Sequence, residues 1–367
     1  MNIPLIKPFI NDDIKQRVLD VLDSGYLTEG PVTKEFEKKF ASYMGCKHAI
    51  AVTSCTTGLE MALRVLNIGP GDEVIVPDYT YPATASVIPI VGATAVIVDV
   101  TKDSMLIDYN AIEAAITERT KAIMPVSAFG NPLDFDKLNE IKKKHNLYII
   151  EDAAPSVGAE FKGVKVGNLA DITVFSFHPR KFITTGEGGM ITTNNDVWAQ
   201  WLNSYKHFGM DMSGTNREGI QFEMIGTNYK LSNILSAVGL GQLAIIDDLL
   251  QKRLSHANNY LRLLEAEKSI SLPVTTKNGS HSYQSFIVYH PNRNAIMNRL
   301  RSNGIEVQIG TYALHMHNAF NNNPLVKLHS QMENSKWCFE NALTLPLFND
   351  LNFEQQEMIV KEISKSE

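Results

Sequence analysis

The sequence predicts an α/β protein. We expect a large domain with a mainly parallel, doubly wound sheet, followed by a smaller C-terminal α+β domain. Two observations carry this prediction. Short runs that are apolar along their whole length alternate with helical stretches, which is typical of parallel strands covered by helices on both faces. The 367 residues, 44% of them hydrophobic, also suffice for a large core and two domains.

The first half of the chain carries the predicted sheet. Apolar residues at helical spacing predict helices over 10–23 and 33–44, before the first strand. Strands are then expected at 48–54, 73–77, 94–100, 122–126, 147–152, 172–177 and 189–193. Helices are expected after the first and second strands and before the fifth.

The later part of the chain is expected to leave the sheet. Residues 206–229 are rich in Gly, Asn and Met and form a long loop, which is uncommon inside a compact domain and often functional. A helical run over 230–266 follows. Beyond it we expect strands at 285–290 and 305–309 and helices over 293–303 and 353–365. The domain boundary is placed inside the helical run, with a large domain over 1–245 and a small domain over 246–367.

Composition narrows the class of protein. A net charge of −6 argues against a broad nucleic-acid surface, which needs clustered Lys and Arg. The three cysteines, Cys46, Cys55 and Cys338, lack the spacing of a zinc site or a disulfide framework. The N-terminus has no apolar stretch of the secretory type, and the most apolar segment, 87–100, is shorter than a membrane span. We therefore expect a cytoplasmic protein without nucleic-acid or membrane partners.

Candidate site residues follow the predicted strands, because ligands of doubly wound proteins bind beyond the carboxyl ends of the strands. Segment 53–58, TSCTTG, lies where a helix begins after the first strand. Its free N–H groups and hydroxyls suit a phosphate, although one of these residues could simply be the N-cap. Tyr79 and Tyr81 follow the second strand, where a ring could stack on a planar ligand or be ordinarily half-buried.

An acid and an amine are the remaining candidate site residues after the predicted strands. Glu151 and Asp152 end a very apolar strand, where a carboxylate needs a cationic partner such as a protonated pyridine nitrogen, or else serves as a cap or ion pair. Lys181 lies between the sixth strand and a glycine-rich turn; in a dry pocket such a lysine attacks carbonyl groups. Ser176, at the strand end, could add a phosphate contact. A phosphate cradle, a stacking ring, an acid for a ring nitrogen and an amine for an aldehyde match pyridoxal 5′-phosphate (PLP).

Sequence motifs along nearly the whole chain resemble the DegT/DnrJ/EryC1/StrS sugar aminotransferases, of the aspartate aminotransferase superfamily (PLP fold type I). The similar segments are 30–45, 53–63, 71–84, 149–154, 176–193 and 226–243. The resemblance implies amino transfer from L-glutamate to C3 or C4 of a nucleotide-linked keto sugar, giving an amino sugar for polysaccharide or glycoconjugate biosynthesis.

The resemblance also implies residue roles. Lys181 is the expected Schiff-base lysine, Asp152 the partner of the pyridine nitrogen, and Tyr81 the stacking ring in place of the usual Phe or Trp. Two alternatives are a non-catalytic regulator or binding protein of the same fold, and a dehydratase that uses pyridoxamine phosphate. The pair of Lys181 and Asp152 argues against the regulator. The dehydratases replace the lysine with histidine, so Lys181 also argues against a dehydratase.

The phosphate contacts implied by the resemblance are Cys55, Thr56 and Ser176. Cys55 stands where the family usually has glycine, so a thiol is expected near the cofactor. Pro155 replaces a Gln or His and removes one side-chain contact to the cofactor. Asn228 is expected to reach the phosphate of the other subunit, which implies an obligatory homodimer with two shared active sites.

Four further residues are candidates for substrate contacts: Arg180, Tyr312, His315 and His317. Arg180 lies beside the lysine and could meet a carboxylate or a phosphate. In a strand, the two histidines would share a face and could suggest a metal, but no third ligand is apparent, so we expect no metal site. Ordinary polar surface is the competing interpretation for all four.

Overall fold

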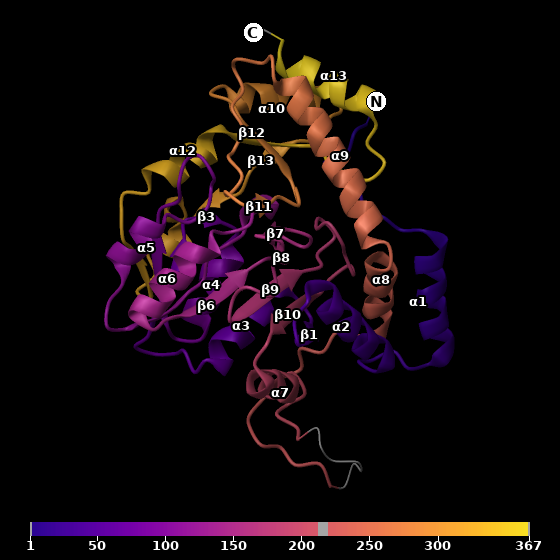
Figure 1. Cartoon of the computed structure of the whole chain (residues 1–367), viewed down its shortest axis with the longest axis vertical. Helices are drawn as coiled ribbons and strands as arrows, with labels where there is room; N and C mark the ends of the chain where they lie inside the picture. The colour runs from indigo at the N-terminus through magenta and orange to yellow at the C-terminus, as the bar shows by residue number, and fades with distance from the viewer. Residues whose placement is uncertain (1, 212–218, 366–367) are drawn as a thin grey trace.

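The computed structural model describes residues 2–211 and 219–365 (Figure 1). Its main sheet has eight strands among these residues, in the order β1-β10-β9-β6-β5-β2-β4-β15. Their bounds are β1 His48–Val52, β2 Glu73–Pro77, β4 Thr94–Val98, β5 Thr120–Ile123, β6 Tyr148–Asp152, β9 Ile172–Ser176, β10 Gly189–Thr193 and β15 Val326–Leu328. The pairs from β9 to β15 are parallel, whereas β10 runs antiparallel to both β1 and β9. The predicted α/β class with a mainly parallel sheet is confirmed.

Helices cover both faces of this sheet. The described helices of this part are α1 Asp12–Ser24, α2 Pro31–Met44, α3 Cys55–Val65, α4 Pro82–Ile90, α5 Tyr109–Ala115, α6 Phe135–His145, α7 Asp196–Tyr205 and α8 Asn233–Leu243, with a short 3₁₀ turn, η1, at Ala128–Gly130. Alternate side chains of each strand serve opposite faces. Ile50 and Val52 of β1 join the core under α3, α4 and α7, whereas Ala49 and Ala51 join the core under α2 and α8.

The helical run expected over 230–266 is two helices instead of one. α8 ends at Leu243, and α9 (Ile246–Leu264) leaves it at an angle of 62°. Gly239 and Gly241 let α8 lie against α2 and α1, where an added Cβ would come within 2.6 Å of Phe36 and Ile14. α8 therefore stays on the sheet, and α9 continues to the small domain (Figure 1). Within the described ranges, no single helix has the length and apolarity of a membrane span, although the bent pair α8 and α9 together does.

The small domain is built on a three-stranded sheet in the order β12-β16-β13. Its elements are β12 Phe286–Tyr289, α10 Arg293–Ser302, β13 Gln308–Ile309, α12 Glu333–Asn341, β16 Ala342–Leu345 and α13 Phe353–Ile363. The strand expected over 305–309 is therefore regular only at its end. Ile3 bridges Ile305, so the first residues lie against this domain, and Figure 1 draws both chain ends there.

Short elements join the two parts. They are β3 Tyr79–Thr80, β7 Glu160–Phe161, β8 Val164–Lys165, β11 Gly279–Ser280, β14 Tyr312–Ala313, η3 Leu314–Met316 and α11 Asn318–Asn321. β14 pairs with β3, β11 pairs with β7, and β15 extends the main sheet beside β4. The chain beyond residue 245 thus contacts the main sheet at several places, and the division at that residue stays a prediction. Of the long loop expected over 206–229, residues 212–218 lie outside the described ranges.

Candidate active site

The carboxyl ends of β1, β6 and β9 lie on one edge of the main sheet. β1 and β9 both run antiparallel to β10, so they point the same way, and β6 is parallel to β9. Ser54 and Cys55 follow β1, Asp152 ends β6 and Ser176 ends β9. The strand directions therefore bring together residues that are far apart in the sequence, at the edge where ligands of such sheets bind.

Lys181 lies on the loop after β9. Its backbone N–H donates to the carbonyl oxygen of His178 at 2.8 Å, which closes a turn. Burial lowers the pKa of the Lys181 amine, and the nearby charges of Asp152 and Cys55 only partly oppose this effect. A desolvated amine loses its proton more readily than one in water and is then nucleophilic toward carbonyl carbon.

Asp152 is 4% exposed and is held by three donors. The hydroxyl of Thr84 donates to its Oδ2 at 2.7 Å, and the N–H of Ala154 and the thiol of Cys55 donate to its Oδ1 at 3.1 and 3.8 Å. Burial raises the pKa of Asp152, while these hydrogen bonds and the charge of Lys181 favour the ionised form. A cation such as a protonated ring nitrogen would compensate the buried charge.

The two acids that end β6 lie in different surroundings. Glu151, next to Asp152, points to the opposite face of the strand, as the alternation of a β-strand requires. Its carboxylate accepts hydrogen bonds from Ser127 and Thr173, and burial raises its pKa to about 7. Of the two acids considered from the sequence, Asp152 is the one that lies beside Lys181.

The first turn of α3 offers donors at the same edge. Ser54 is the N-cap: its hydroxyl accepts from the N–H of Thr57 at 3.1 Å, and Thr57 caps Ser54 in return. This leaves Cys55 and Thr56, the first two helical residues, whose N–H groups have no partner inside the helix. Capping and anion binding, posed as alternatives from the sequence, are thus compatible. A Cβ on Gly189 would lie 2.7 Å from the nitrogen of Cys55, so glycine lets β10 approach this turn.

Ser176 adds a hydroxyl to this edge. It is buried at the end of β9, and its Oγ accepts a hydrogen bond from the N–H of His178 at 3.3 Å. A buried amine, a buried acid and the N–H and hydroxyl groups at the start of α3 fit the aldehyde, the ring nitrogen and the phosphate of PLP. The residues that would hold it are Lys181, Asp152, Cys55, Thr56 and Ser176.

Aromatic residues from both parts of the chain lie near this edge. β14 pairs with β3, which sets Tyr312 opposite Thr80. The rings of Tyr81 and Tyr312 are 6.2 Å apart, and the ring of His317 lies 5.6 Å from that of Tyr312. Tyr81 is 65% exposed, so its ring is available to a ligand.

His315 and His317 do not share a strand face, contrary to the expectation from their spacing. Residues 314–316 form the 3₁₀ turn η3, so the two side chains diverge. His315 binds Asp78, a fully buried carboxylate that accepts its N–H at 2.7 Å and contacts its Nδ1 at 2.6 Å. Within residues 2–211 and 219–365, no group of three or more His, Cys, Asp or Glu side chains could hold a metal ion.

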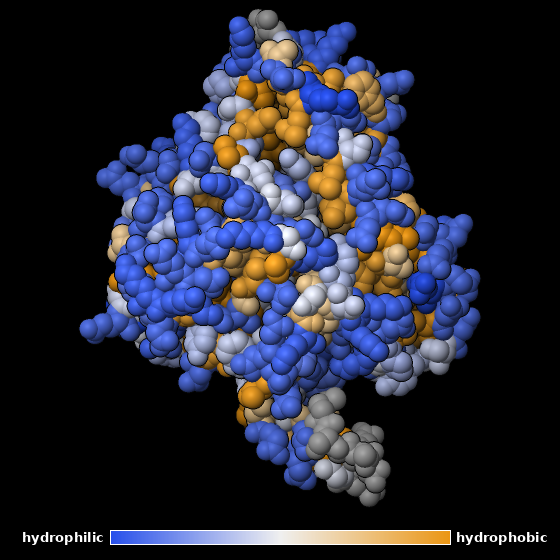
Figure 2. Space-filling view, in the orientation of Figure 1, coloured by the Kyte–Doolittle hydropathy of each residue, from blue (hydrophilic) through white to orange (hydrophobic). Residues whose placement is uncertain are grey.

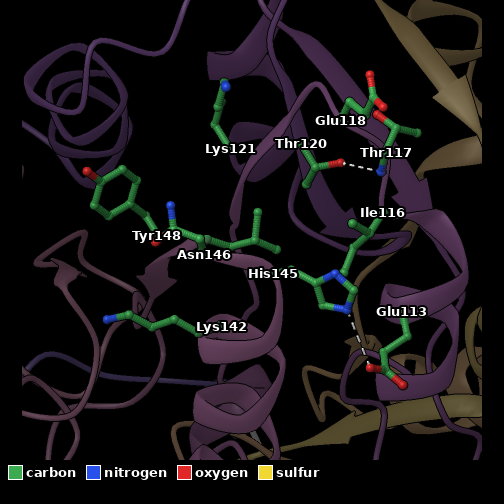
Figure 3. A pocket seen from close by; sticks show the side chains of 11 residues that line it. Glu113, Ile116, Thr117, Glu118, Thr120, Lys121, Lys142, His145, Asn146 and Tyr148 are labelled. Carbon is green, nitrogen blue, oxygen red and sulfur yellow. Dashed lines mark hydrogen bonds and ion pairs between the residues drawn. The ribbon is translucent and has the colours of Figure 1, made fainter.

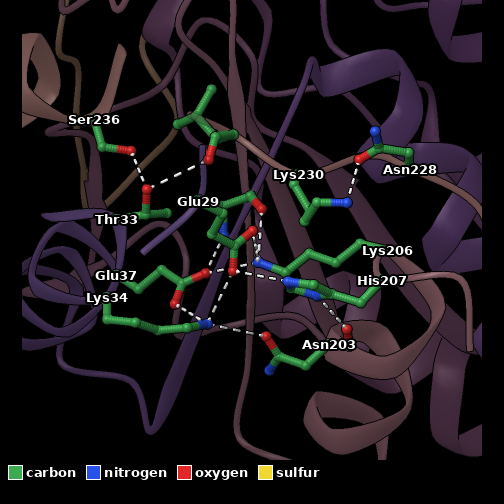
Figure 4. Close-up of polar contacts among 12 residues, drawn as sticks. Glu29, Thr33, Lys34, Glu37, Asn203, Lys206, His207, Asn228, Lys230 and Ser236 are labelled. Carbon is green, nitrogen blue, oxygen red and sulfur yellow. Dashed lines mark hydrogen bonds and ion pairs between the residues drawn. The ribbon is translucent and has the colours of Figure 1, made fainter. Parts of the chain in front are cut away.

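Arg180 and Asn228 lie in other neighbourhoods. Arg180 is exposed, and its Nη1 donates to Gln308 of β13 at 3.3 Å. Asn228 accepts a hydrogen bond from Lys230 at 2.5 Å. Figure 4 shows this pair beside Lys206, a fully buried lysine whose Nζ lies 2.9 Å from Glu37. The loop that carries Asn228 is thus anchored on a buried ion cluster.

Sequence reasoning missed two residues of the site, Thr84 and Asp78. Both lie in segment 77–84, which was singled out for its tyrosines, but only the folded chain shows that Thr84 binds Asp152 and Asp78 binds His315. A hydroxyl in the first turn of a helix and an acid at a strand end were the available signals.

The site described above is distinct from a surface hollow of about 750 Å³ lined by residues from Glu113 to Tyr148 (Figure 3). That hollow is lined by Thr120 and Tyr148, the first residues of β5 and β6, so it lies at the opposite edge of the sheet. Its charged lining is partly paired within itself, as by Glu113 and His145 at 3.7 Å. It contains none of the candidate site residues.

Comparison with known proteins identifies the family. The model of the DegT/DnrJ/EryC1/StrS aminotransferase family matches residues 8–364. A GDP-perosamine synthase of Caulobacter vibrioides is 39% identical over 321 residues, which cover 86% of this chain and 85% of the relative. A UDP-4-amino-4-deoxy-L-arabinose–oxoglutarate aminotransferase of Shewanella sediminis is 35% identical over 379 residues, covering 99% and 97%.

Solved structures agree with the sequence relatives. A putative sugar aminotransferase from Streptococcus pneumoniae superimposes with a TM-score of 0.93 at 31% identity in its pyridoxamine phosphate (PMP) form, covering 99% of this chain and 98% of the other. The PLP form of the same protein gives the same TM-score and coverage. The chain belongs to the DegT/DnrJ/EryC1/StrS aminotransferase family, and its cofactor is pyridoxal 5′-phosphate.

Proposed function

We propose that this aminotransferase moves the amino group of L-glutamate to C3 or C4 of a nucleotide-linked keto sugar, giving an amino sugar for polysaccharide or glycoconjugate biosynthesis. The observation that carries the proposal is that the buried amine of Lys181 lies beside the buried carboxylate of Asp152, at the sheet edge where α3 begins. The names of two relatives support the substrate class, since one name contains a GDP-linked sugar and the other a UDP-linked 4-amino sugar. Oxoglutarate, in the second name, is the keto acid of glutamate.

Lys181 and Asp152 have complementary tasks in this proposal. When bound, PLP supplies an aldehyde carbon for the lysine and a ring that withdraws electrons. Burial lowers the pKa of the Lys181 amine, so this amine would hold the aldehyde of PLP and would be the group that takes and returns the proton that moves during the transfer. Asp152, held by three hydrogen-bond donors, would face the ring nitrogen of PLP, and its ionised form would favour a proton on that nitrogen.

The other candidate residues position the reactants. Cys55, Thr56 and Ser176 bind the phosphate, and Tyr81 stacks on the ring. Arg180 meets a carboxylate or phosphate of a substrate. Tyr312, His315 and His317 contact the sugar, and the location of Tyr312 beside Tyr81 supports this assignment.

The sugar assignment has its own test. Because Asp78 fixes one ring nitrogen of His315, the other is free to meet a hydroxyl of the sugar. His315→Asn is expected to raise KM for the keto sugar while the reaction with L-glutamate alone keeps its rate. His329→Asn, at an exposed site after β15, is the matched control. Unchanged KM in His315→Asn would remove this histidine from the sugar site.

We also propose a homodimer with shared sites. Large apolar side chains are exposed on α1, just after it, and on the arm after α7, which projects at the bottom of Figure 1. They include Leu19, Leu22, Tyr26, Leu27, Phe222 and Ile225, the last of them 96% exposed. Figure 2 shows apolar surface beside α1 and on the upper part of this arm. A second copy of the chain would cover such surface.

Shared sites are testable by mixing two inactive variants, Lys181→Ala and Asn228→Ala. If Asn228 serves the site of the other subunit, a mixed dimer contains one site with both native residues, and activity returns on mixing. If each site is made within one subunit, no native site forms and activity stays absent.

The substrate class is tested by incubating the protein with PLP, L-glutamate and a panel of GDP- and UDP-linked keto sugars. We expect at least one sugar to be aminated, with one 2-oxoglutarate formed per amino sugar, and no turnover in Lys181→Ala. If glutamate is converted with a simple keto acid as acceptor while every nucleotide sugar stays unchanged, the sugar assignment is wrong.

A further inference from the structure

The backbone on both sides of Lys181 is held by one side chain, that of Gln284. Its Nε2 donates to the carbonyl oxygen of Arg180 at 2.7 Å, and its Oε1 accepts from the N–H of Phe182 at 2.7 Å. The amide therefore bridges the peptide groups immediately before and after the lysine. Gln284 is 7% exposed, so these two hydrogen bonds compete little with water.

The segment that carries Gln284 is itself fixed in an unusual conformation. Tyr283, immediately before it, has a φ of 49°, in the left-handed region that side chains other than glycine seldom adopt. Its N–H donates to His281 at 2.8 Å, and the two rings stack with centroids 4.0 Å apart. Strain of this kind persists where the surroundings impose it, and it often accompanies a functional constraint.

A buried cation holds the same segment. Arg253 of α9 donates from Nη1 to the carbonyl oxygens of Tyr283 and Gln284, at 2.9 and 3.0 Å. Its guanidinium carbon lies 5.0 Å from the ring centre of Phe182, the residue after the lysine. Arg253 is 7% exposed, and burial lowers its pKa to about 10. The desolvated guanidinium of Arg253 thus contacts two carbonyl groups and one ring, all next to the two hydrogen bonds by which Gln284 clamps the backbone around Lys181.

The large domain contacts the segment from the other side. Gly130, with a φ of 98°, accepts the N–H of Ser282 at 2.9 Å. A Cβ at Gly130 would lie 2.7 Å from the Ser282 hydroxyl and 2.9 Å from the nitrogen of Gln284. Only glycine permits this approach, so both parts of the chain fix the position of Gln284.

We propose that Gln284 is the positioning residue of the cofactor-binding lysine, and that Arg253 and Tyr283 hold it in place for that task. The inference rests on the proposed role of Lys181. By fixing both flanking peptides, Gln284 limits the lysine to the conformation in which its amine stays in the dry site beside Asp152. Gln284 and Arg253 both lie beyond residue 245, so the lysine backbone is held by a part of the chain that is distant in sequence.

The test replaces Gln284 by methionine, which keeps the volume and removes both hydrogen bonds. The matched control is Gln242→Met: Gln242 is also buried, and it binds the N–H of Thr184 on the same loop and the carbonyl of Phe9, both at 2.7 Å. Gln242 stabilises the loop without bridging Lys181, so the two variants separate positioning from general support.

The main readout needs no cofactor. Competitive acetylation of the PLP-free protein across a pH series, followed by mass spectrometry of the Lys181 peptide, gives the pKa of that amine. In Gln284→Met we expect a rise of about one pKa unit, because the freed amine reaches water. In the PLP-loaded protein we expect kcat to fall about tenfold or more, with KM for L-glutamate unchanged. In Gln242→Met we expect neither change.

An unchanged pKa and kcat in Gln284→Met, or equal changes in both variants, would overturn the proposal. If Gln284→Met fails to fold, amide hydrogen exchange in the unmodified protein tests the proposal. The Phe182 N–H must then exchange as slowly as the Thr184 N–H, and fast exchange at Phe182 would contradict its hydrogen bond to Gln284. The acetylation result is independent of turnover. A failure of the proposed function, seen as no amination of any sugar, is therefore distinguishable from a failure of this inference.

Discussion

The hydroxyl of Thr84 should set the pH range in which the enzyme works. It donates to the buried Asp152 carboxylate at 2.7 Å, and a hydrogen bond to a charged group contributes about 1.5–3 kcal/mol. Because the bond favours the ionised form, Thr84→Val raises the pKa of Asp152 further above its ordinary value. At about 1.4 kcal/mol per pKa unit, the rise is about 1–2 units. Asp152 is then protonated at a higher pH than before.

The assay is the pH dependence of the single-turnover reaction of the PLP-loaded enzyme with L-glutamate. Activity depends on ionised Asp152, so the acid limb of the profile should move upward by about 1–2 pH units in Thr84→Val. The control is Thr80→Val, which removes the 2.9 Å contact between Thr80 and Thr84 and leaves the Thr84–Asp152 bond in place. An acid limb that stays in place in Thr84→Val, or moves equally in both variants, would refute this reasoning.

Three further outcomes follow from the described contacts. Lys206→Met removes the fully buried one of the two lysines that contact Glu29 and Glu37 and leaves the half-exposed Lys34 beside these carboxylates. Denaturation should therefore show a loss of about 3–5 kcal/mol, against less than about 1 kcal/mol for the exposed Lys39→Met. Burial alone would raise the pKa of Glu37, but the neighbouring lysines hold this pKa below its ordinary value of 4.5, so the ionised form of Glu37 stabilises the fold. Denaturation at several pH values should therefore show that stability falls as the pH drops below about 4.5. This pH dependence should be weaker in Lys206→Met. Gly189→Ala places a Cβ 2.6 Å from the backbone of the α3 N-cap, so a PLP titration should show affinity reduced about tenfold or more; equal affinity would mean that this turn does not hold the phosphate.

Much of the sheet could be predicted because its strands are apolar along their whole length. The segments expected at 73–77 and 189–193 are strands over those residues. The position of the site also followed from the sequence, since polar residues that interrupt such runs at strand ends meet at one edge. Lys181 and Asp152 were predicted as candidate residues in this way.

What the sequence did not reveal depends on contacts between distant segments. The break between α8 and α9 arises from packing against α1 and α2, and periodicity alone cannot show it. The histidines 315 and 317 appeared to share a face because η3 has no clear sequence signal. The clamp by Gln284 joins residues 104 positions apart, and a glutamine before a strand looks ordinary until the chain is folded.

The visible absorbance spectrum of the protein with PLP, recorded before and after L-glutamate, tests the role of Lys181 most directly. We predict a band of the lysine-bound cofactor that glutamate replaces by the spectrum of the aminated cofactor, and no such band in Lys181→Ala. A protein that shows no band with PLP present, or a Lys181→Ala variant that retains it, would contradict the assignment of this lysine.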